Sequence, residues 1–262
     1  MTSWLESQFS LTGKKALVTG SSKGIGASIA QALAHAGADI VLVGRTNESL
    51  EATKSAIVKI GRKVEIVVCD VSSAEAIKEA FADIADLKVD ILINNAGSIS
   101  RAPAAEAQME EWNRIIDTNL NSVFQISQAC GRAMIAQGTG TIINIASLLS
   151  FQGGINVPAY TASKHAVIGL VRGLSEEYMR RPITFNAIFP GYVDTDIVRG
   201  QLSGLMRRFE TDADGALAIM AKGNRHERLL QVDEITASAM WLCSEAARSV
   251  NGQTIEIAGG QS

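Results

Sequence analysis

Two side chains with complementary acid–base chemistry lie four residues apart in Tyr160-Thr-Ala-Ser-Lys164. On a helix, positions i and i+4 share one face, so the phenol and the ammonium would point the same way. An isolated tyrosine titrates near about pH 10, and a neighbouring positive charge lowers that pKa by favouring the phenolate. The pair could therefore exchange a proton with a bound molecule near neutral pH.

A serine stands where it could complete this chemistry. Ser147 directly follows the apolar run Thr141–Ala146, which we expect to be a strand of a parallel sheet. The carboxyl edge of such a sheet carries ligand sites, and a hydroxyl there can hold a carbonyl oxygen. A Tyr-x-x-x-Lys pattern alone is common on solvated helix faces, so the chemistry depends on this combination.

A glycine-rich turn follows the first apolar run in Thr19-Gly20-Ser21-Ser22-Lys23-Gly24-Ile25-Gly26. Glycines let the backbone approach a diphosphate, whose charge is favoured by free N–H groups and by the dipole of the following helix. The spacing differs from the more common G-x-G-x-x-G, and a tight turn without a ligand is the alternative. Its place in the first strand–helix unit favours a dinucleotide site.

The end of the second strand indicates which dinucleotide is bound. An acid at this point would bind the ribose hydroxyls of NAD and repel the 2′-phosphate of NADP. Here the sequence reads Val43-Gly44-Arg45-Thr46-Asn47, and Arg45 can form a charge-assisted fork with a phosphate. Lys23 offers a second cation. NADP is therefore favoured, with NAD still possible and a solvated Arg45 as the alternative.

Apolar runs alternate with helical patterns along the chain, which is typical of strand–helix units around a parallel sheet. We expect a single α/β domain over residues 1–262, a Rossmann-type doubly wound sheet of about seven strands with helices on both faces. Its cofactor half would span about 12–140 and its catalytic and substrate half about 141–262. The expected strands are Lys14–Thr19, Asp39–Val43, Val64–Val68, Val89–Ile93, Thr141–Ala146, Ile183–Ile188 and Gln253–Ile257. The expected helices are Gly24–His35, Asn47–Lys59, 72–85, Met109–Gln137 and Pro158–Met179, with one further helix before the last strand.

One segment interrupts this alternation. Residues 194–222 form a connection longer than usual, and such insertions are often lids or binding loops. We expect a lid over about 194–228. The alternative is a pair of structural helices that pack against another subunit.

Composition excludes several classes of protein. The 262 residues carry 24 Lys and Arg against 27 Asp and Glu, a net charge of −3 that argues against nucleic acid or an anionic membrane as the main partner. No apolar stretch of about 20 residues exists, and the first residues lack a signal peptide. Three widely spaced cysteines fit a reducing compartment, and the three histidines have no ligand-spaced partners, so no metal is expected.

Taken together, these stretches resemble the short-chain dehydrogenase/reductase family over nearly the whole chain. The matching motifs are TGSSKGIG (19–26), Asp70-Val71, NNAG (94–97), Asn119, Ser147, Tyr160, Lys164 and PGYVDT (190–195). The resemblance implies an oxidoreductase in which Tyr160 is the general acid or base and Ser147 orients the substrate oxygen. It implies that Lys164 holds the nicotinamide ribose and lowers the pKa of Tyr160, with Asn119 supporting a water-linked proton relay.

The resemblance also implies further cofactor contacts and an assembly. Asp70 and Val71 would border the adenine, Asn95 would line the cofactor cleft, and Val193 and Thr195 would touch the nicotinamide end. Gly20, Ser22, Lys23, Gly24, Ile25 and Gly26 would cradle the phosphates. A cytoplasmic homotetramer is expected.

The stretch Ile142–Lys164 and the opening FSLTGKKALVTG resemble the branch of 2-dehydro-3-deoxy-gluconate and gluconate 5-dehydrogenases. That likeness implies a secondary alcohol or ketone of a small sugar acid or keto acid as substrate. Arg101, on the loop after the fourth strand, could bind its carboxylate, with a surface arginine as the alternative. Reduction of a 3-oxoacyl thioester or of ketones in general is the second enzymatic hypothesis. A catalytically silent cofactor-binding protein is the third.

Overall fold

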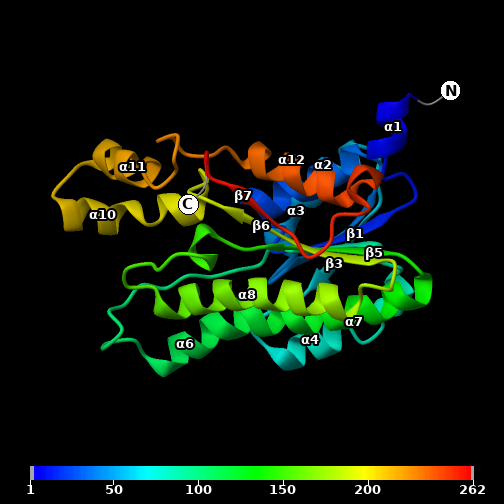
Figure 1. Cartoon of the computed structure of the whole chain (residues 1–262), viewed down its shortest axis with the longest axis horizontal. Helices are drawn as coiled ribbons and strands as arrows, with labels where there is room; N and C mark the ends of the chain where they lie inside the picture. The colour runs from blue at the N-terminus through cyan, green and yellow to red at the C-terminus, as the bar shows by residue number, and fades with distance from the viewer. Residues whose placement is uncertain (1–2, 261–262) are drawn as a thin grey trace.

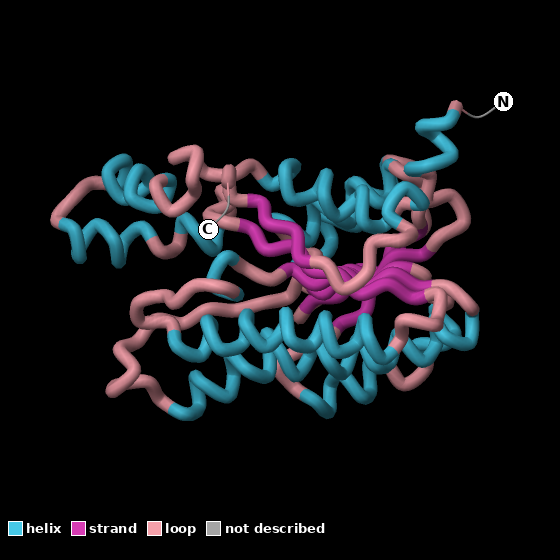
Figure 2. Tube along the Cα trace, viewed as in Figure 1, coloured by secondary structure: helices cyan, strands magenta, loops and turns pink. Residues whose placement is uncertain are grey.

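A seven-stranded, wholly parallel sheet forms the centre of the molecule, in the order β3-β2-β1-β4-β5-β6-β7 (Figure 2). The computed structural model describes residues 3–260. The strands are β1 (Lys15–Thr19), β2 (Asp39–Gly44), β3 (Val64–Val68), β4 (Ile91–Asn94), β5 (Gly140–Ile145), β6 (Ile183–Pro190) and β7 (Thr254–Ile257). The expected fold class is confirmed, and each expected strand is present with its ends shifted by at most two residues.

The five inner strands are largely apolar because both faces of the sheet are covered there, whereas the edge strands β3 and β7 are less buried. Leu17 and Val18 are adjacent on β1 and point to opposite faces, yet both have 0% of their surface exposed. They belong to two separate clusters of buried side chains, one on each side of the sheet. A doubly wound sheet therefore divides the core into two layers.

Each layer is closed by its own helices (Figure 1). The first face is covered by α2 (Gly24–His35), α3 (Asn47–Lys59) and α12 (Val232–Cys243). The second face is covered by α4 (Ala74–Ala80), α6 (Met109–Ile116), α7 (Ser122–Gln137) and α8 (Pro158–Glu177). Among the described residues, no helix has the length and apolar character needed to cross a membrane.

Two expected helices are interrupted. A π-helical turn at Asp117–Asn121 divides the helix expected over Met109–Gln137 into α6 and α7. The helix expected over 72–85 ends at Ala80 and is followed by the short α5 (Ile84–Leu87). The amino-terminal α1 (Trp4–Phe9) was not expected, and a capping box between Ser3 and Glu6 begins it. Short local hydrogen-bond patterns of this kind leave little periodic signal in a sequence.

The segment between β6 and α12 extends beyond the sheet as three helices, at the left of Figure 1. They are α9 (Asp196–Arg199), α10 (Leu202–Phe209) and α11 (Ala213–Ala221). The two ends of this segment meet, since Leu230 N donates to Tyr192 O over 2.9 Å and Asp194 N donates to Leu230 O over 2.9 Å. The insertion therefore begins and ends at the same place, at the carboxyl edge of the sheet.

Candidate active site

The residues singled out from the sequence gather at the carboxyl ends of the central strands. The glycine turn follows β1, the Asn94-Asn95 pair closes β4, Ser147 follows β5, and Tyr192 follows β6. Because all strands are parallel, these ends share one edge of the sheet. The fold thus brings together motifs that are far apart in the sequence.

The glycine turn is shaped by its lack of side chains. Gly20 and Gly24 have φ angles of +63° and +58°, in the left-handed region that favours glycine. A Cβ on Gly26 would collide with the carbonyl oxygen of Gly20 and the side-chain amide of Asn95. Because Gly26 has no side chain, the backbone of the turn packs against the start of α2 more closely than any other residue at this position would allow.

Asn95 holds this turn in place. Its Nδ2 donates to the carbonyl oxygens of Thr19 and Gly20, each over 3.0 Å. Thr19 Oγ1 in turn accepts from the backbone N–H groups of Asn95 and Ala96, each over 3.0 Å. Asn95 was expected to line a cofactor cleft, and the structure shows a second task, which is to join β1 to β4. Thr19 lay inside a recognised motif, but nothing in its sequence position signalled this bond.

The two expected phosphate cations differ in their surroundings. Arg45 is exposed and forms no ion pair or hydrogen bond with any of residues 3–260. Lys23 is engaged, since its Nζ lies 2.7 Å from Asp196 Oδ2 on α9. The glycine cradle and the free guanidinium at the end of β2 fit a phosphorylated dinucleotide, with Arg45 as its available cation.

The remaining expected cofactor residues follow the ends of β3 and β6. Asp70 accepts hydrogen bonds from the backbone N–H and the hydroxyl of Ser72, over 3.0 and 2.8 Å, and Val71 beside it is buried. Thr195 Cγ2 would lie 3.7 Å from a Cβ placed on Gly24, so the loop after β6 borders the glycine turn. Val193 is 3% exposed and forms an isolated parallel β-bridge with Leu230.

Lys164 carries a charge into the interior of the protein. Its side chain lies on α8, only 5% exposed, and its Nζ donates to the carbonyl oxygen of Ile145, the last residue of β5, over 2.8 Å. The same Nζ lies 5.6 Å from the centre of the Tyr160 ring. The i, i+4 pairing expected from the sequence is present, and it is anchored to the sheet.

Burial shifts the pKa of both members of this pair. Desolvation lowers the pKa of Lys164 to about 8, because removal from water disfavours the ammonium. Burial also raises the pKa of Tyr160, while a hydrogen bond from Ser147 acts in the opposite direction and the charge of Tyr192 adds to the rise. Burial is the largest cause of the shift, so the pKa of Tyr160 in the protein alone lies above its usual value, and the influence of Lys164 on it stays a prediction.

Asn119 lies in the π-helical turn between α6 and α7, with 1% of its surface exposed. Its Nδ2 donates to Ser98 O over 2.9 Å and to Ser163 Oγ over 3.1 Å, and its Oδ1 accepts from Ser98 N over 2.8 Å. Ser163 Oγ donates to the carbonyl oxygen of Tyr160 over 2.7 Å. Ser163, within Tyr-x-x-Ser-Lys, had no expected role, yet it links Asn119 to the backbone of α8.

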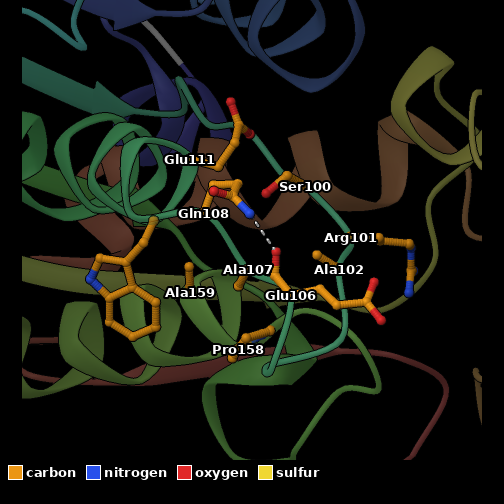
Figure 3. Close-up of a pocket in the computed structure, with 10 residues that line it drawn as sticks. Ser100, Arg101, Ala102, Glu106, Ala107, Gln108, Glu111, Pro158 and Ala159 are labelled. Carbon is orange, nitrogen blue, oxygen red and sulfur yellow. Dashed lines mark hydrogen bonds between the residues drawn. The ribbon is translucent and has the colours of Figure 1, made fainter.

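Arg101 is held by two groups, one of which lies on the insertion between β6 and α12. Its guanidinium donates to Gln201 Oε1 over 2.5 Å and to Ile155 O over 3.3 Å. It lines the rim of a cavity of about 220 Å³ between the loop after β4 and the first turns of α6 and α8 (Figure 3). Ser147 and Tyr160 do not line this cavity, and in Figure 3 the Arg101 side chain extends to its outer edge. The structure thus ties Arg101 to Gln201 on the insertion between β6 and α12, and Arg101 does not share this cavity with Tyr160.

Comparison with known proteins agrees with this geometry. The short chain dehydrogenase family matches residues 14–204. The 2-dehydro-3-deoxy-D-gluconate 5-dehydrogenase of Bacillus subtilis (strain 168) is 44% identical over 258 residues, which cover 98% of each chain. The gluconate 5-dehydrogenase of Gluconobacter oxydans (strain 621H) is 38% identical and 96% of each chain is covered. Among solved structures, the gluconate 5-dehydrogenase of Burkholderia cenocepacia J2315 in complex with NADP and tartrate is 34% identical, with a TM-score of 0.87 over 98% of each chain.

The buried ammonium leads to a prediction about stability. Replacing Lys164 with Met should raise the free energy of unfolding at pH 7 by roughly 1–3 kcal/mol, because the variant avoids the cost of burying a charge. Since the folded pKa of Lys164 is about 8 and its ordinary value is 10.5, the cost is complete below pH 8 and disappears as the pH rises toward 10.5. As the pH rises from 8 to 10.5, the free energy of unfolding of the wild type should therefore increase relative to that of the variant. Urea unfolding at pH 7 and pH 10 measures both, and a variant less stable than the wild type at pH 7 would contradict the account.

Proposed function

Because the chain belongs to the short-chain dehydrogenase family, we propose that it is an NADP-dependent oxidoreductase that interconverts a secondary alcohol and a ketone of a small sugar acid. The observation that carries the proposal is the buried Lys164 beneath Tyr160, with Ser147 hydrogen-bonded to the phenol at the carboxyl edge of the sheet. This arrangement supports a proton-donating role for Tyr160 and a hydrogen-bonding role for Ser147 toward one carbonyl oxygen.

In this proposal each side chain has one task. Ser147 donates a hydrogen bond to the substrate carbonyl and orients it. Tyr160 protonates the same oxygen during reduction and accepts the proton from the alcohol during oxidation. When bound, the nicotinamide supplies or accepts the hydride. Lys164 binds the nicotinamide ribose and stabilises the Tyr160 phenolate by its charge.

Proton supply is proposed to involve Asn119. Its side chain is fully used by Ser98 and Ser163, so the amide acts as a structural link. In a π-helical turn the regular i to i−4 pattern is broken, which frees backbone groups to bind water. We propose that the backbone of this turn holds the first water of a relay that ends at Lys164.

The cofactor contacts are proposed from position. Gly20, Ser22, Lys23, Gly24, Ile25 and Gly26 would hold the diphosphate, and Arg45 the 2′-phosphate. Asp70 and Val71 would border the adenine, with Asn95 in the cleft and Val193 and Thr195 at the nicotinamide. The left-handed Gly20 and Gly24 and the tight approach at Gly26 support this assignment.

The substrate class and the setting of the enzyme rest on the relatives. Two of them act on gluconate derivatives, and a third was solved with tartrate, itself a small hydroxy acid. We propose that Arg101 binds the substrate carboxylate and that residues 194–228 form a lid. We also propose one domain over residues 1–262, with a cofactor half and a catalytic half that meet near residue 140. The first two and last two residues of this range lie outside the described part. A cytoplasmic homotetramer is proposed from the same likeness.

The central chemical prediction concerns Tyr160. Tyr160→Phe should lower kcat by a factor of about 10² to 10⁴, because the ring still packs but the proton donor is gone. NADPH consumption is followed with a keto sugar acid and, in a parallel assay, with a 3-oxoacyl thioester. Cofactor affinity serves as the control and should change little. Preferential turnover of the thioester by the wild type would overturn the proposed substrate class, and substantial kcat in the variant would overturn the role of Tyr160.

Cofactor choice should depend on Arg45. Arg45→Ala should weaken NADPH binding roughly ten- to hundredfold and leave NADH nearly unaffected, since one charged hydrogen-bond partner of the phosphate is lost. Lys23→Ala is the matched control and should cost less, because Lys23 is bound to Asp196. Introducing an acid at Gly44 is a poorer test, because a Cβ there would lie 2.9 Å from Leu50 Cδ2. Equal use of NADH and NADPH by the wild type would refute the assignment.

Carboxylate recognition should depend on Arg101. Arg101→Ala should lower kcat/KM for a keto acid about tenfold or more, with little change for the uncharged amide of the same compound. Gln201→Ala is the control, since it removes the lid partner of Arg101 but keeps the cation. If Gln201→Ala reproduces the loss, or if acid and amide suffer equally, Arg101 only ties the loop to the lid.

A further inference from the structure

A buried side-chain amide joins the two ends of the lid. Asn224 has 0% of its surface exposed, although it lies in a loop. Its Oδ1 accepts from Tyr192 N over 2.8 Å, and its Nδ2 donates to Tyr192 O over 2.9 Å and to Arg228 O over 2.7 Å. Both amide protons are thus used on backbone carbonyls, and the carboxamide pairs with Tyr192 as a neighbouring strand would.

Two glycines allow this close approach. A Cβ on Gly191 would collide with Asn224 Oδ1, and a Cβ on Gly223 would collide with the ring of Tyr192. The amide of Asn224 therefore packs on Gly191, while the ring of Tyr192 packs on Gly223. Gly191 precedes Tyr192 and leaves room for Asn224, while Gly223 precedes Asn224 and leaves room for Tyr192. Tyr192 is therefore held through both its backbone and its ring.

Tyr192 lies at the same edge of the sheet as the candidate catalytic residues. It follows the end of β6 at Pro190, and β6 is the neighbour of β5, after which Ser147 stands. Its side chain is half-buried and within electrostatic range of Tyr160, whose pKa it helps to raise. The lid begins two residues later, at Asp194. A phenol is thus fixed between the candidate reacting centre and the base of the lid.

We propose that Tyr192 is a specificity-determining residue whose hydroxyl binds a substrate hydroxyl, and that Asn224 is a positioning residue that fixes Tyr192 there. This inference rests on the proposed function, because it requires a substrate with hydroxyl groups beside the reacting carbon. A phenol both donates and accepts hydrogen bonds, so it suits a neutral hydroxyl better than a carboxylate alone. A substrate without that hydroxyl would leave the half-buried phenol of Tyr192 without a hydrogen-bond partner. Its kcat/KM would therefore be lower.

The test compares two substrates in one enzyme. The first is a keto sugar acid with hydroxyl groups next to the carbonyl, and the second is the same keto acid without them. Tyr192→Phe should reduce the ratio of their kcat/KM values roughly five- to tenfold, mainly through the KM of the hydroxylated compound. An unchanged ratio would overturn the role of Tyr192.

Asn224 is tested against a second buried asparagine. Asn186 is 1% exposed and also bonds only to backbone, since its Nδ2 donates to Val250 O over 2.8 Å and its Oδ1 accepts from Gln253 N over 3.0 Å. Asn224→Ala should reduce the substrate ratio as Tyr192→Phe does. Asn186→Ala should lower thermal stability and leave the ratio as in the wild type. Equal effects of both on the ratio would mean that Asn224 only supports the fold.

A double variant keeps the proposal falsifiable if Asn224→Ala folds poorly. Asn224→Ser replaces the carboxamide with a hydroxyl, which keeps one polar group at this position, and it is combined with Tyr192→Phe. If Asn224 acts through Tyr192, the double variant should show the ratio of Tyr192→Phe alone, whereas additive losses would contradict the proposal. Failure of the proposed function is seen separately, as a wild type that does not turn over the hydroxylated keto acid at all.

Discussion

The site depends on holding one ammonium group inside the protein. Lys164 is 5% exposed, and its hydrogen bond to Ile145 joins α8 to the end of β5. A charge so placed is costly, and its pKa of about 8 records the cost. The same bond fixes the first turn of α8 against the sheet, and with it Tyr160 beside Ser147. Lys164 thus lowers the stability of the fold at a candidate catalytic position.

The rest of the edge is assembled by small polar clamps rather than by packing alone. Asn95 and Thr19 join β1 to β4 beneath the glycine turn, and Asn119 with Ser163 ties the π-helical turn to α8. Asn224 joins the loop after β6 to the loop before α12. Each clamp satisfies backbone groups where a strand or helix ends, which is where a sheet edge would otherwise leave them unpaired. Three loops at the candidate site are therefore each tied to a neighbouring element by side-chain hydrogen bonds.

The sheet and its helices could be predicted from the sequence because apolar periodicity and glycine positions carry that information. Leu17 and Val18 fill both faces of β1, and this continuous apolar run marks a parallel strand. The long-range contacts could not be predicted. The bonds from Arg101 to Gln201 and from Lys23 to Asp196 join residues 100 and 173 positions apart. The raised pKa of Tyr160 depends on burial, which a motif does not report.

We propose that burial keeps Tyr160 protonated and that added positive charge at the site lowers the pKa of its phenol toward neutral pH. Phenolate absorbance, taken as the difference between wild type and Tyr160→Phe across a pH titration, measures this pKa directly. With NADP⁺ bound, the midpoint should fall at least one pH unit below that of the protein alone, because the nicotinamide charge joins that of Lys164. A midpoint that is the same with and without NADP⁺, or higher with it, would contradict the account.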